Sequence, residues 1–336
     1  MTILDVFNQD AFGVVSLTLS INKLPWVPSR LGKMGLFAGK GVPSTTVAVE
    51  ERHNTLSLVS TQPRGSRGET ASRRARNVRN FTVPHLPTHD AILADDVQGI
   101  RAFGSESNTE AVSTLVNDIM GIHKQNHEIT WEWHRVGALK GEVLDADGTT
   151  TIYNWFTEFG ITQDSVSFDF GTSTDGYLKK KALTIKRLIR DALGGTGYRK
   201  IHAMCGDQFF DNFVSHAEVA DSYGRHSDNS FARSQQDGEG GFEWGGIVWE
   251  NYSGGLGTQK FFDDDKATFF PVGAPDIFIR RNAPADYMEA VNTPGKPMYA
   301  KKQNMDFDKG VELEMQSNPL FMCTRPKCLI EGTDDT

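Results

Sequence analysis

The stretch ESNTEAVSTLVNDIMGIHKQNHEITWEWHRVGALK, residues 106–140, decides the fold. Selected positions in it recur at alternating steps of three and four, the spacing of one buried stripe on a helix. The nine positions of this stripe are Val112, Leu115, Ile119, Ile122, Asn126, Ile129, Trp133, Val136 and Lys140. Seven of them are apolar; Asn126 and Lys140 are the exceptions. We therefore predict one long helix, about 50 Å from end to end.

The flanks of this stretch predict where the helix begins and ends. Ser107 and Glu110 have the spacing of a capping box, with Ser105 as a competing N-cap. Gly141 can end the helix in the left-handed conformation. A coiled coil is the alternative, but Asn126 and Lys140 weaken its seam and Trp133 is an awkward knob. A single helix lying across a sheet fits better.

The chain after the helix alternates between strand and helix patterns. Asp145–Gly148 is a turn signal between 141–144 and 150–153, which predicts a hairpin. An amphipathic helix is predicted at 178–193, ended by Gly194, and a short one at 208–217, capped by Asp207. Strands are predicted at 201–205, 246–250, 266–272, 276–280 and 310–315. The polar region 225–260 surrounds one of them and is expected to be mobile. The whole pattern is α+β.

The chain before the helix lacks the apolar area of an independent domain. Residues 1–30 are broken by Pro25 and Pro28 and predict an extended arm. Residues 35–85 predict a β excursion with strands at 46–50, 55–59 and 80–83. A two-stranded ribbon is marginally stable alone, so we expect it to lie on another subunit. The glycine-rich stretch 35–41 is one residue short of a phosphate loop, and we expect a flexible loop there.

The ribbon carries a concentration of arginine in an acidic protein. The net charge of the chain is −8, yet 64–79 holds six arginines against one acid, Glu69. The six are Arg64, Arg67, Arg73, Arg74, Arg76 and Arg79. The stretch could bind nucleic acid, but no aromatic residues interleave with the arginines to stack bases. It could also be a disordered basic tail, although it lies between strand-like segments rather than at a terminus. We favour pairing with acidic side chains of a neighbouring copy, because arginine binds carboxylates in two parallel bonds. These residues are our predicted subunit-interface residues.

The sequence predicts no catalytic centre, no cofactor and no metal site. It lacks a G-x-S-x-G elbow and a complete dinucleotide fingerprint. His123, His127 and His134 share one helical region but not the His-Glu-x-x-His spacing, so we expect solvated or interfacial histidines. Asp263–Asp265 is expected to be a solvated acidic turn. Three cysteines, Cys205, Cys323 and Cys328, predict free thiols in a reducing compartment. No apolar run is long enough for a membrane span, and the N-terminus predicts no signal peptide.

Several segments together resemble the lambda-like phage major capsid protein E family. They are ILADDVQGIRAFG (92–104), ALKG (138–141), FDKGVELE (307–314), QSNPL (316–320) and CTRP (323–326). The resemblance covers essentially the whole chain and is weakest at 220–260. It implies a tailed-phage, Hong Kong 97-like capsid fold with an N-terminal arm (1–34), an extended loop (35–90), a peripheral domain (91–175, with a spine helix at 106–140), an axial domain (176–272) and returning strands (273–336).

The resemblance also implies a function. Copies of the chain would form hexamers and pentamers of an icosahedral head around double-stranded DNA, made in the host cytoplasm with a scaffolding protein and a portal. A decoration protein is an option that the sequence leaves open, and DNA contact would be non-specific. Some relatives of the fold cross-link subunits through Lys and Asn, but no such pair is assignable here. The alternatives are an encapsulin-like nanocompartment shell and, from another class, a soluble α+β enzyme.

Overall fold

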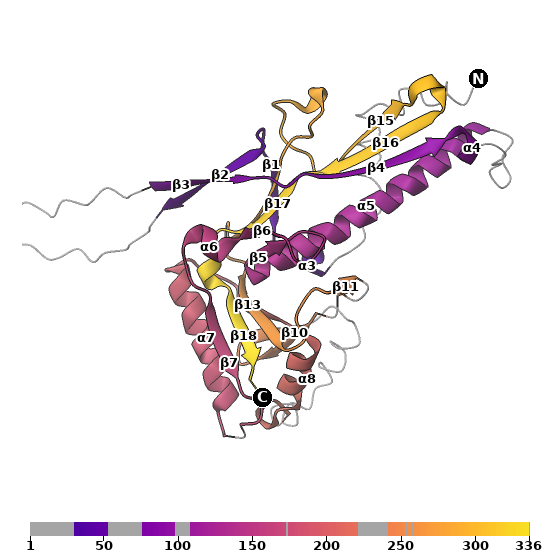
Figure 1. Ribbon diagram of the computed structural model, residues 1–336. Coiled ribbons are helices and arrows are strands. Elements are labelled where there is room, and N and C mark those ends of the chain that lie inside the picture. Colours follow the sequence, from indigo (N-terminus) through magenta and orange to yellow (C-terminus); the bar gives the residue numbers. More distant parts are fainter. Residues whose placement is uncertain are drawn as a thin grey trace, which may run out of the picture.

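The computed structural model describes residues 30–52, 76–97, 108–172, 174–220, 241–252, 254–256 and 259–335. They form two bodies, each with its own hydrophobic core, and one long helix, α5 (Asn108–Lys140), belongs to both (Figure 1). Val116, Met120 and Trp131 of α5 pack in the first core, whereas Val136 and Leu139 pack in the second. The molecule is therefore built around α5, as the sequence predicts.

One body is a six-stranded mixed sheet with two helices packed against it. Its strand order is β7 (Asp164–Phe168), β18 (Ile330–Asp334), β13 (Lys266–Val272), β8 (Lys200–Cys205), β10 (Ile247–Asn251) and β9 (Phe242–Trp244). The helices are α7 (Tyr177–Leu193) and α8 (Asp207–Ser215). Strand β18 brings the C-terminus into this sheet beside β7, parallel to it (Figure 1). The central strands are almost wholly buried, as their apolar runs require.

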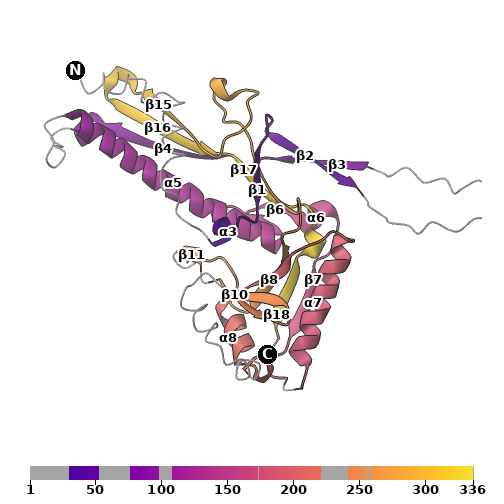
Figure 2. The ribbon, with the colours of Figure 1, turned by 180° about the vertical axis from the view of Figure 1, so that it is seen from behind.

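The other body places α5 along an antiparallel sheet. The order of this sheet is β15 (Tyr299–Asn304), β16 (Gly310–Ser317) and β4 (Leu86–Leu93), and α4 (Ala94–Val97) follows β4. Both views show α5 running along the sheet for much of its length (Figures 1 and 2). Thr88 of β4 is hydrogen-bonded to His127 of α5. The prediction of a single helix across a sheet is confirmed.

A second small sheet corrects the expectation for residues 35–41. Its order is β1 (Ala38–Gly41), β14 (Phe278–Asn282) and β17 (Pro319–Cys323), and β1 pairs with β14 in parallel. The stretch was expected to be a flexible loop because AGKG has no strand character. The strand forms because β14, about 240 residues later, offers an edge. A short helix, α3 (Arg30–Lys33), precedes it.

The remaining elements are hairpins and short helices. The hairpin predicted around Asp145–Gly148 is confirmed as β5 (Glu142–Leu144) and β6 (Thr151–Asn154), followed by α6 (Trp155–Phe159). The ribbon consists of β2 (Thr46–Arg52) and β3 (Arg76–Thr82); the strand predicted at 55–59 lies outside the described residues. The other elements are β11 (Gly255–Leu256), β12 (Gln259–Lys260) and 3-10 helices η2 (Met288–Ala290), η3 (Asp306–Asp308) and η4 (Pro326–Cys328).

The long helix differs from its prediction in one important respect. It ends at Lys140, and Gly141 has φ +88°, so the predicted left-handed end is confirmed. The predicted stripe is wrong at Ile122, which is 59% exposed, and Asn126 is exposed too. The buried face instead runs through Val116, Met120 and Trp131. Polar residues interrupt this face, so counting apolar residues selected a neighbouring one.

Candidate subunit interface

The ribbon of β2 and β3 leaves the body from an aromatic base. Val47 of β2 and Phe81 of β3 are opposite each other in the antiparallel register, and both are buried. Phe81 meets Trp155 edge-on at 5.4 Å between ring centroids, and Tyr153 stacks on Trp155 at 4.9 Å. The Tyr153 hydroxyl donates to the carbonyl of Thr82 at 2.6 Å. This packing fixes the ribbon where it begins.

The ribbon becomes exposed beyond that base. Val78 is 57% exposed, although the same strand buries Phe81 three residues later. Among the described residues, β2 and β3 pair only with each other. An exposed strand edge with apolar side chains is a surface that another chain can cover.

The six predicted interface arginines do not share one environment. The side chain of Arg79 folds back on its own chain: it donates to the carbonyl of Glu158, and its guanidinium lies over the Phe159 ring at 5.3 Å. Arg76 begins β3 opposite Arg52. Arg64, Arg67, Arg73 and Arg74 lie outside the described residues. Arg79 therefore contributes to the base of the ribbon.

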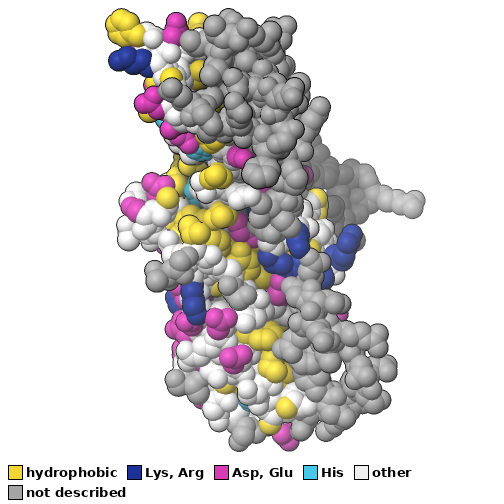
Figure 3. Space-filling model, turned by 90° about the vertical axis from the view of Figure 1, so that its right-hand side faces the viewer, with side chains coloured by type: hydrophobic (Ala, Val, Ile, Leu, Met, Phe, Trp, Pro, Cys, Tyr) yellow, Lys and Arg dark blue, Asp and Glu magenta, His cyan; other side chains and the backbone are white. Residues whose placement is uncertain are grey.

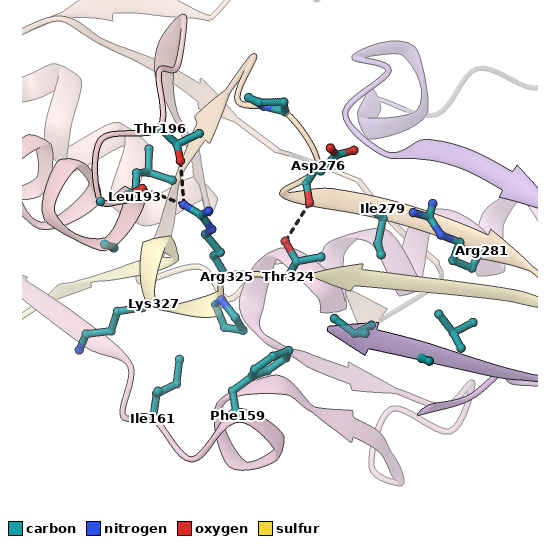
Figure 4. Close-up of a pocket in the computed structure, with 17 residues that line it drawn as sticks. Phe159, Ile161, Leu193, Thr196, Asp276, Ile279, Arg281, Thr324, Arg325 and Lys327 are labelled. Carbon is teal, nitrogen blue, oxygen red and sulfur yellow. Dashed lines mark hydrogen bonds between the residues drawn. The ribbon is translucent and has the colours of Figure 1, made fainter. Parts of the chain in front are cut away.

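An open cleft of about 660 Å³ lies beside the ribbon base (Figure 4). Val47 and Val49 of β2 line one side, and the end of α7 lines the other. Arg325 extends between them and donates to the Leu193 carbonyl at 2.7 Å and to Thr196 at 2.8 Å, so it satisfies the C-terminus of α7. The cleft combines apolar walls with cationic side chains. It could not be predicted from the sequence, because its residues come from five distant segments.

Two buried carboxylates hold the segment that leads into β1. Glu132 of α5 accepts from the backbone N–H groups of Leu31 at 2.6 Å and Gly32 at 3.2 Å, and from Arg135 at 2.9 Å. The Tyr252 hydroxyl donates to the same carboxylate at 3.0 Å. A carboxylate this deep is tolerated because its oxygens are hydrogen-bonded and a cation is adjacent.

The second carboxylate belongs to the other body. The carboxylate of Glu250 in β10 accepts from Nε and from Nη2 of Arg30, the latter at 2.6 Å. It is also hydrogen-bonded to His202 Nε2 at 2.9 Å. Burial raises the pKa of Glu250, but the hydrogen bonds from Arg30 and His202 outweigh it, so the pKa lies below its ordinary value. Thus α3 is held both by the shared helix α5 and by the six-stranded sheet. Pairwise sequence reasoning missed this arrangement, because the partners are 100 and 220 residues apart.

His127 and His134 of α5 are buried, which corrects the expectation that they are solvated, whereas His123 is partly exposed. His127 is 3% and His134 is 1% exposed. Burial lowers the pKa of each to about 4. His127 is hydrogen-bonded to Ser317 at 2.9 Å and to Thr88 at 3.1 Å, so it joins α5 to the sheet. Within the described part of the chain, no group of three or more metal-ligating side chains comes together.

Other predicted polar and thiol positions are structural. Asp263 pairs with Lys140 at 3.1 Å and Asp264 with Lys260 at 2.5 Å, so the acidic turn carries ion pairs rather than only solvent. Cys205, Cys323 and Cys328 are buried free thiols, as predicted. Burial raises the pKa of Cys205 and Cys323, which makes both thiols poor nucleophiles.

Large apolar side chains are exposed at projecting parts of the molecule. Phe307 at the turn between β15 and β16 is 91% exposed, and Met288 and Val291 in the loop before β15 are 87% and 54% exposed. On the face shown in Figure 3, hydrophobic side chains also gather across the middle of the molecule. Exposed apolar groups on separate projections are typical of a protein with several partner surfaces. In the described residues, no helix has the length and apolar character to cross a membrane.

Comparisons with known proteins agree with this arrangement. The family model described as phage major capsid protein E matches residues 13–334. The major capsid protein of Pseudomonas phage KPP10 is 26% identical over 342 residues, which cover 96% of this chain and 97% of the relative. The major capsid protein of Salmonella phage Felix O1 is 26% identical over 368 residues, covering 97% of each.

Solved structures show the same fold at lower identity. The putative capsid protein of a prophage of E. coli CFT073 has a TM-score of 0.59 at 14% identity, covering 96% of this chain and 99% of its own. The mature capsid of bacteriophage PhiM1 has a TM-score of 0.54 at 11% identity, covering 89% of this chain and 85% of its own. The predicted capsid fold is confirmed.

Proposed function

The chain belongs to the phage major capsid protein E family and is a phage major capsid protein, and we propose that its copies form hexamers and pentamers of an icosahedral head around double-stranded DNA. The observation that carries this proposal is the match to the family over residues 13–334, which includes part of the proposed arm, the ribbon and both bodies. Two full-length relatives that are themselves major capsid proteins support it.

The shape of the subunit supports assembly from identical copies. A ring closes when one patch of each copy meets a different patch of the next. The ribbon buries only its base, at Val47 and Phe81, and a two-stranded ribbon gains little stability alone. Covering the ribbon with the next copy would bury the exposed Val78 and supply the missing layer.

We extend the proposal to the arginines and to the division of the chain. Arg64, Arg67, Arg73, Arg74 and Arg76 would pair with carboxylates of a neighbouring copy, which the net charge of −8 makes plentiful. Arg79 is excluded from this group because its own chain already holds it. The arm would be 1–34, the extended loop 35–90, the peripheral domain 91–175 with 273–336, and the axial domain 176–272.

The remaining partners follow from the same proposal. The chain would be made in the host cytoplasm and become part of the virion, with a scaffolding protein and a portal as assembly partners. A decoration protein is a further candidate partner. Contact with packaged DNA would be non-specific. It would also be weak, because a chain with a net charge of −8 attracts phosphate little.

The arginine proposal has a matched test within the ribbon. We expect the triple variant Arg73→Ala, Arg74→Ala, Arg76→Ala to fold with an unchanged unfolding temperature and to form few shells in electron micrographs. Arg79→Ala should lower the unfolding temperature instead, by the equivalent of about 1 kcal/mol, because it removes a hydrogen bond and a cation–π contact of the ribbon base. Normal shells from the triple variant would contradict the arginine proposal.

Electron microscopy of the purified particles tests the main proposal. Closed icosahedral shells that contain nuclease-protected double-stranded DNA, when purified from phage-producing cells, are the expected result. Shells that enclose protein cargo and no DNA would support a nanocompartment instead. A protein that remains a monomer at all concentrations and with scaffolding protein present would overturn the assembly proposal.

A further inference from the structure

Arg280 is a positioned cation on the sheet that α5 covers. In the register of the small sheet, Gly39, Arg280 and Phe321 lie side by side on β1, β14 and β17. The Arg280 guanidinium lies over the Trp131 ring of α5 at 5.4 Å. A Cβ on Gly39 would come within 2.6 Å of its terminal nitrogen. Glycine at this position therefore lets the arginine lie flat between β1 and the tryptophan.

This cation lacks a counter-charge in the part of the chain that the structure describes. Arg135 lies over Phe321 at 5.2 Å and is paired with Glu132, but no carboxylate pairs with Arg280 among the described residues. Its buried Nε also has no hydrogen-bond acceptor there. Burial and the nearby Arg135 lower the pKa of Arg280. A half-buried guanidinium beside a second one is costly unless an anion is close.

A small pocket of about 150 Å³ reaches both guanidinium groups. Leu31, Gly32 and Gly35 form its other side, and residues 1–29 immediately precede this segment in the sequence. The volume suits one side chain and is too small for a stretch of nucleic-acid backbone. The pocket therefore combines space for an anionic side chain with an adjacent segment that can supply one.

We propose that Arg280 and its pocket form an anchoring site for the N-terminal segment, in which an aspartate carboxylate of residues 1–29 binds the guanidinium. The segment carries two acids, Asp5 and Asp10. Asp10 lies 20 positions before Arg30, an extended reach of about 66 Å, so either acid can reach this pocket on its own or a neighbouring copy. This inference goes beyond shell formation, because it assigns a specific side-chain site to the arm.

Hydrogen exchange of residues 1–29 tests the site in the full-length protein, as a soluble subunit and in assembled particles. We expect Arg280→Gln to speed exchange in this segment at least about tenfold, as the loss of a charge-assisted hydrogen bond predicts. The double variant Asp5→Asn, Asp10→Asn should give the same result, and the single variants identify the acid. Gly39→Ala should act like Arg280→Gln, because it displaces the guanidinium.

Two controls separate the site from general destabilisation. Arg281→Gln changes the next residue on the same strand, which lines the cleft on the opposite face, and should leave exchange unchanged. Adding Arg280→Gln to the aspartate double variant should cause no further increase. Equal exchange in the parent protein and Arg280→Gln, in both subunit and particle, would overturn the proposal. Additive effects of the arginine and aspartate changes would overturn it as well.

Discussion

His134 shows what one buried side chain does to the response of the protein to acid. Its ring is 1% exposed, burial lowers its pKa to about 4, and nearby Asp145 offsets only part of that effect. The neutral imidazole is therefore the folded form, whereas the unfolded chain takes up a proton near pH 6.5. Stability contributed by this lowered pKa is complete above pH 6.5 and declines as the pH falls towards 4.

We accordingly predict a measurable change of slope in His134→Gln. The parent protein should lose about 3 kcal/mol of unfolding free energy between pH 6.5 and 4 through this residue, and the variant should not. The variant itself will be less stable than the parent at pH 7.5. Urea unfolding at several pH values gives both curves. If they run parallel through this window, His134 does not titrate as argued.

Two neighbouring positions on α5 test which face of the helix is buried. Ile122 is 59% exposed and Met120 is 2% exposed. We expect Ile122→Asp to fold and to lose less than about 1 kcal/mol, as surface substitutions do. Met120→Asp should prevent soluble folding, because it leaves an unpaired charge in the core. Soluble yield and thermal unfolding compare them, and similar behaviour of the two would show that the buried face is assigned wrongly.

The elements of this fold divide by whether their cause is local. The C-terminal ends of α5 and α7 were predictable, because glycines at 141 and 194 end them in the left-handed conformation. The capping residues predicted at the start of α5, Ser105 and Ser107, lie outside the described residues. The hairpin around Asp145–Gly148 was predictable because its turn signal is also local. β1 was not, because Gly39 carries no strand signal and the strand depends on a distant partner. The buried face of α5 was misplaced because His127 and Glu132 are polar residues that distant groups satisfy.

Gly121 in α5 and Gly141 directly after it provide a prediction at the scale of the element. Gly121 has no neighbouring atom within 4 Å of an added Cβ, whereas at Gly141 that Cβ would lie 2.1 Å from the Phe156 ring and φ is +88°. Gly121→Ala should stabilise the protein by about 0.5 to 1 kcal/mol through helix propensity. Gly141→Ala should destabilise it by about 3 kcal/mol, from backbone strain and overpacking. Chemical denaturation measures both; a loss of stability in Gly121→Ala would contradict the account of the helix.

At the scale of the whole molecule, two hydrophobic cores share one helix, and α3 bridges them. The concentration of arginine in residues 64–79 is evident from the sequence alone, because it depends only on composition. The contacts that hold α3 could not, because Glu132 of α5 and Glu250 of β10 accept from groups of α3 that are at least 100 residues away in the chain. Local sequence patterns predict helices and turns well, but contacts between residues far apart in the sequence determine how the bodies are joined.

The grip on α3 predicts how the two bodies move relative to each other. Arg30→Gln removes the bidentate pair with Glu250, whose carboxylate keeps its contact with His202. We expect the amides of Leu31 and Gly32 to exchange at least about tenfold faster, because α3 then loses its ion pair with the six-stranded sheet. X-ray scattering of the soluble subunit should show a broader distribution of distances between the bodies.

A second contact between the bodies serves as the control for this prediction. Lys140 of α5 pairs with Asp263 at 3.1 Å, but both side chains are substantially exposed, at 33% and 51%. Exposed pairs contribute less than about 1 kcal/mol, so Lys140→Gln should change neither amide exchange nor scattering. The contrast follows from desolvation: the Arg30–Glu250 pair is buried enough for its charges to attract strongly, and the Lys140–Asp263 pair is screened by water. Equal effects of the two variants would mean that the Arg30–Glu250 pair does not hold α3 on the six-stranded sheet.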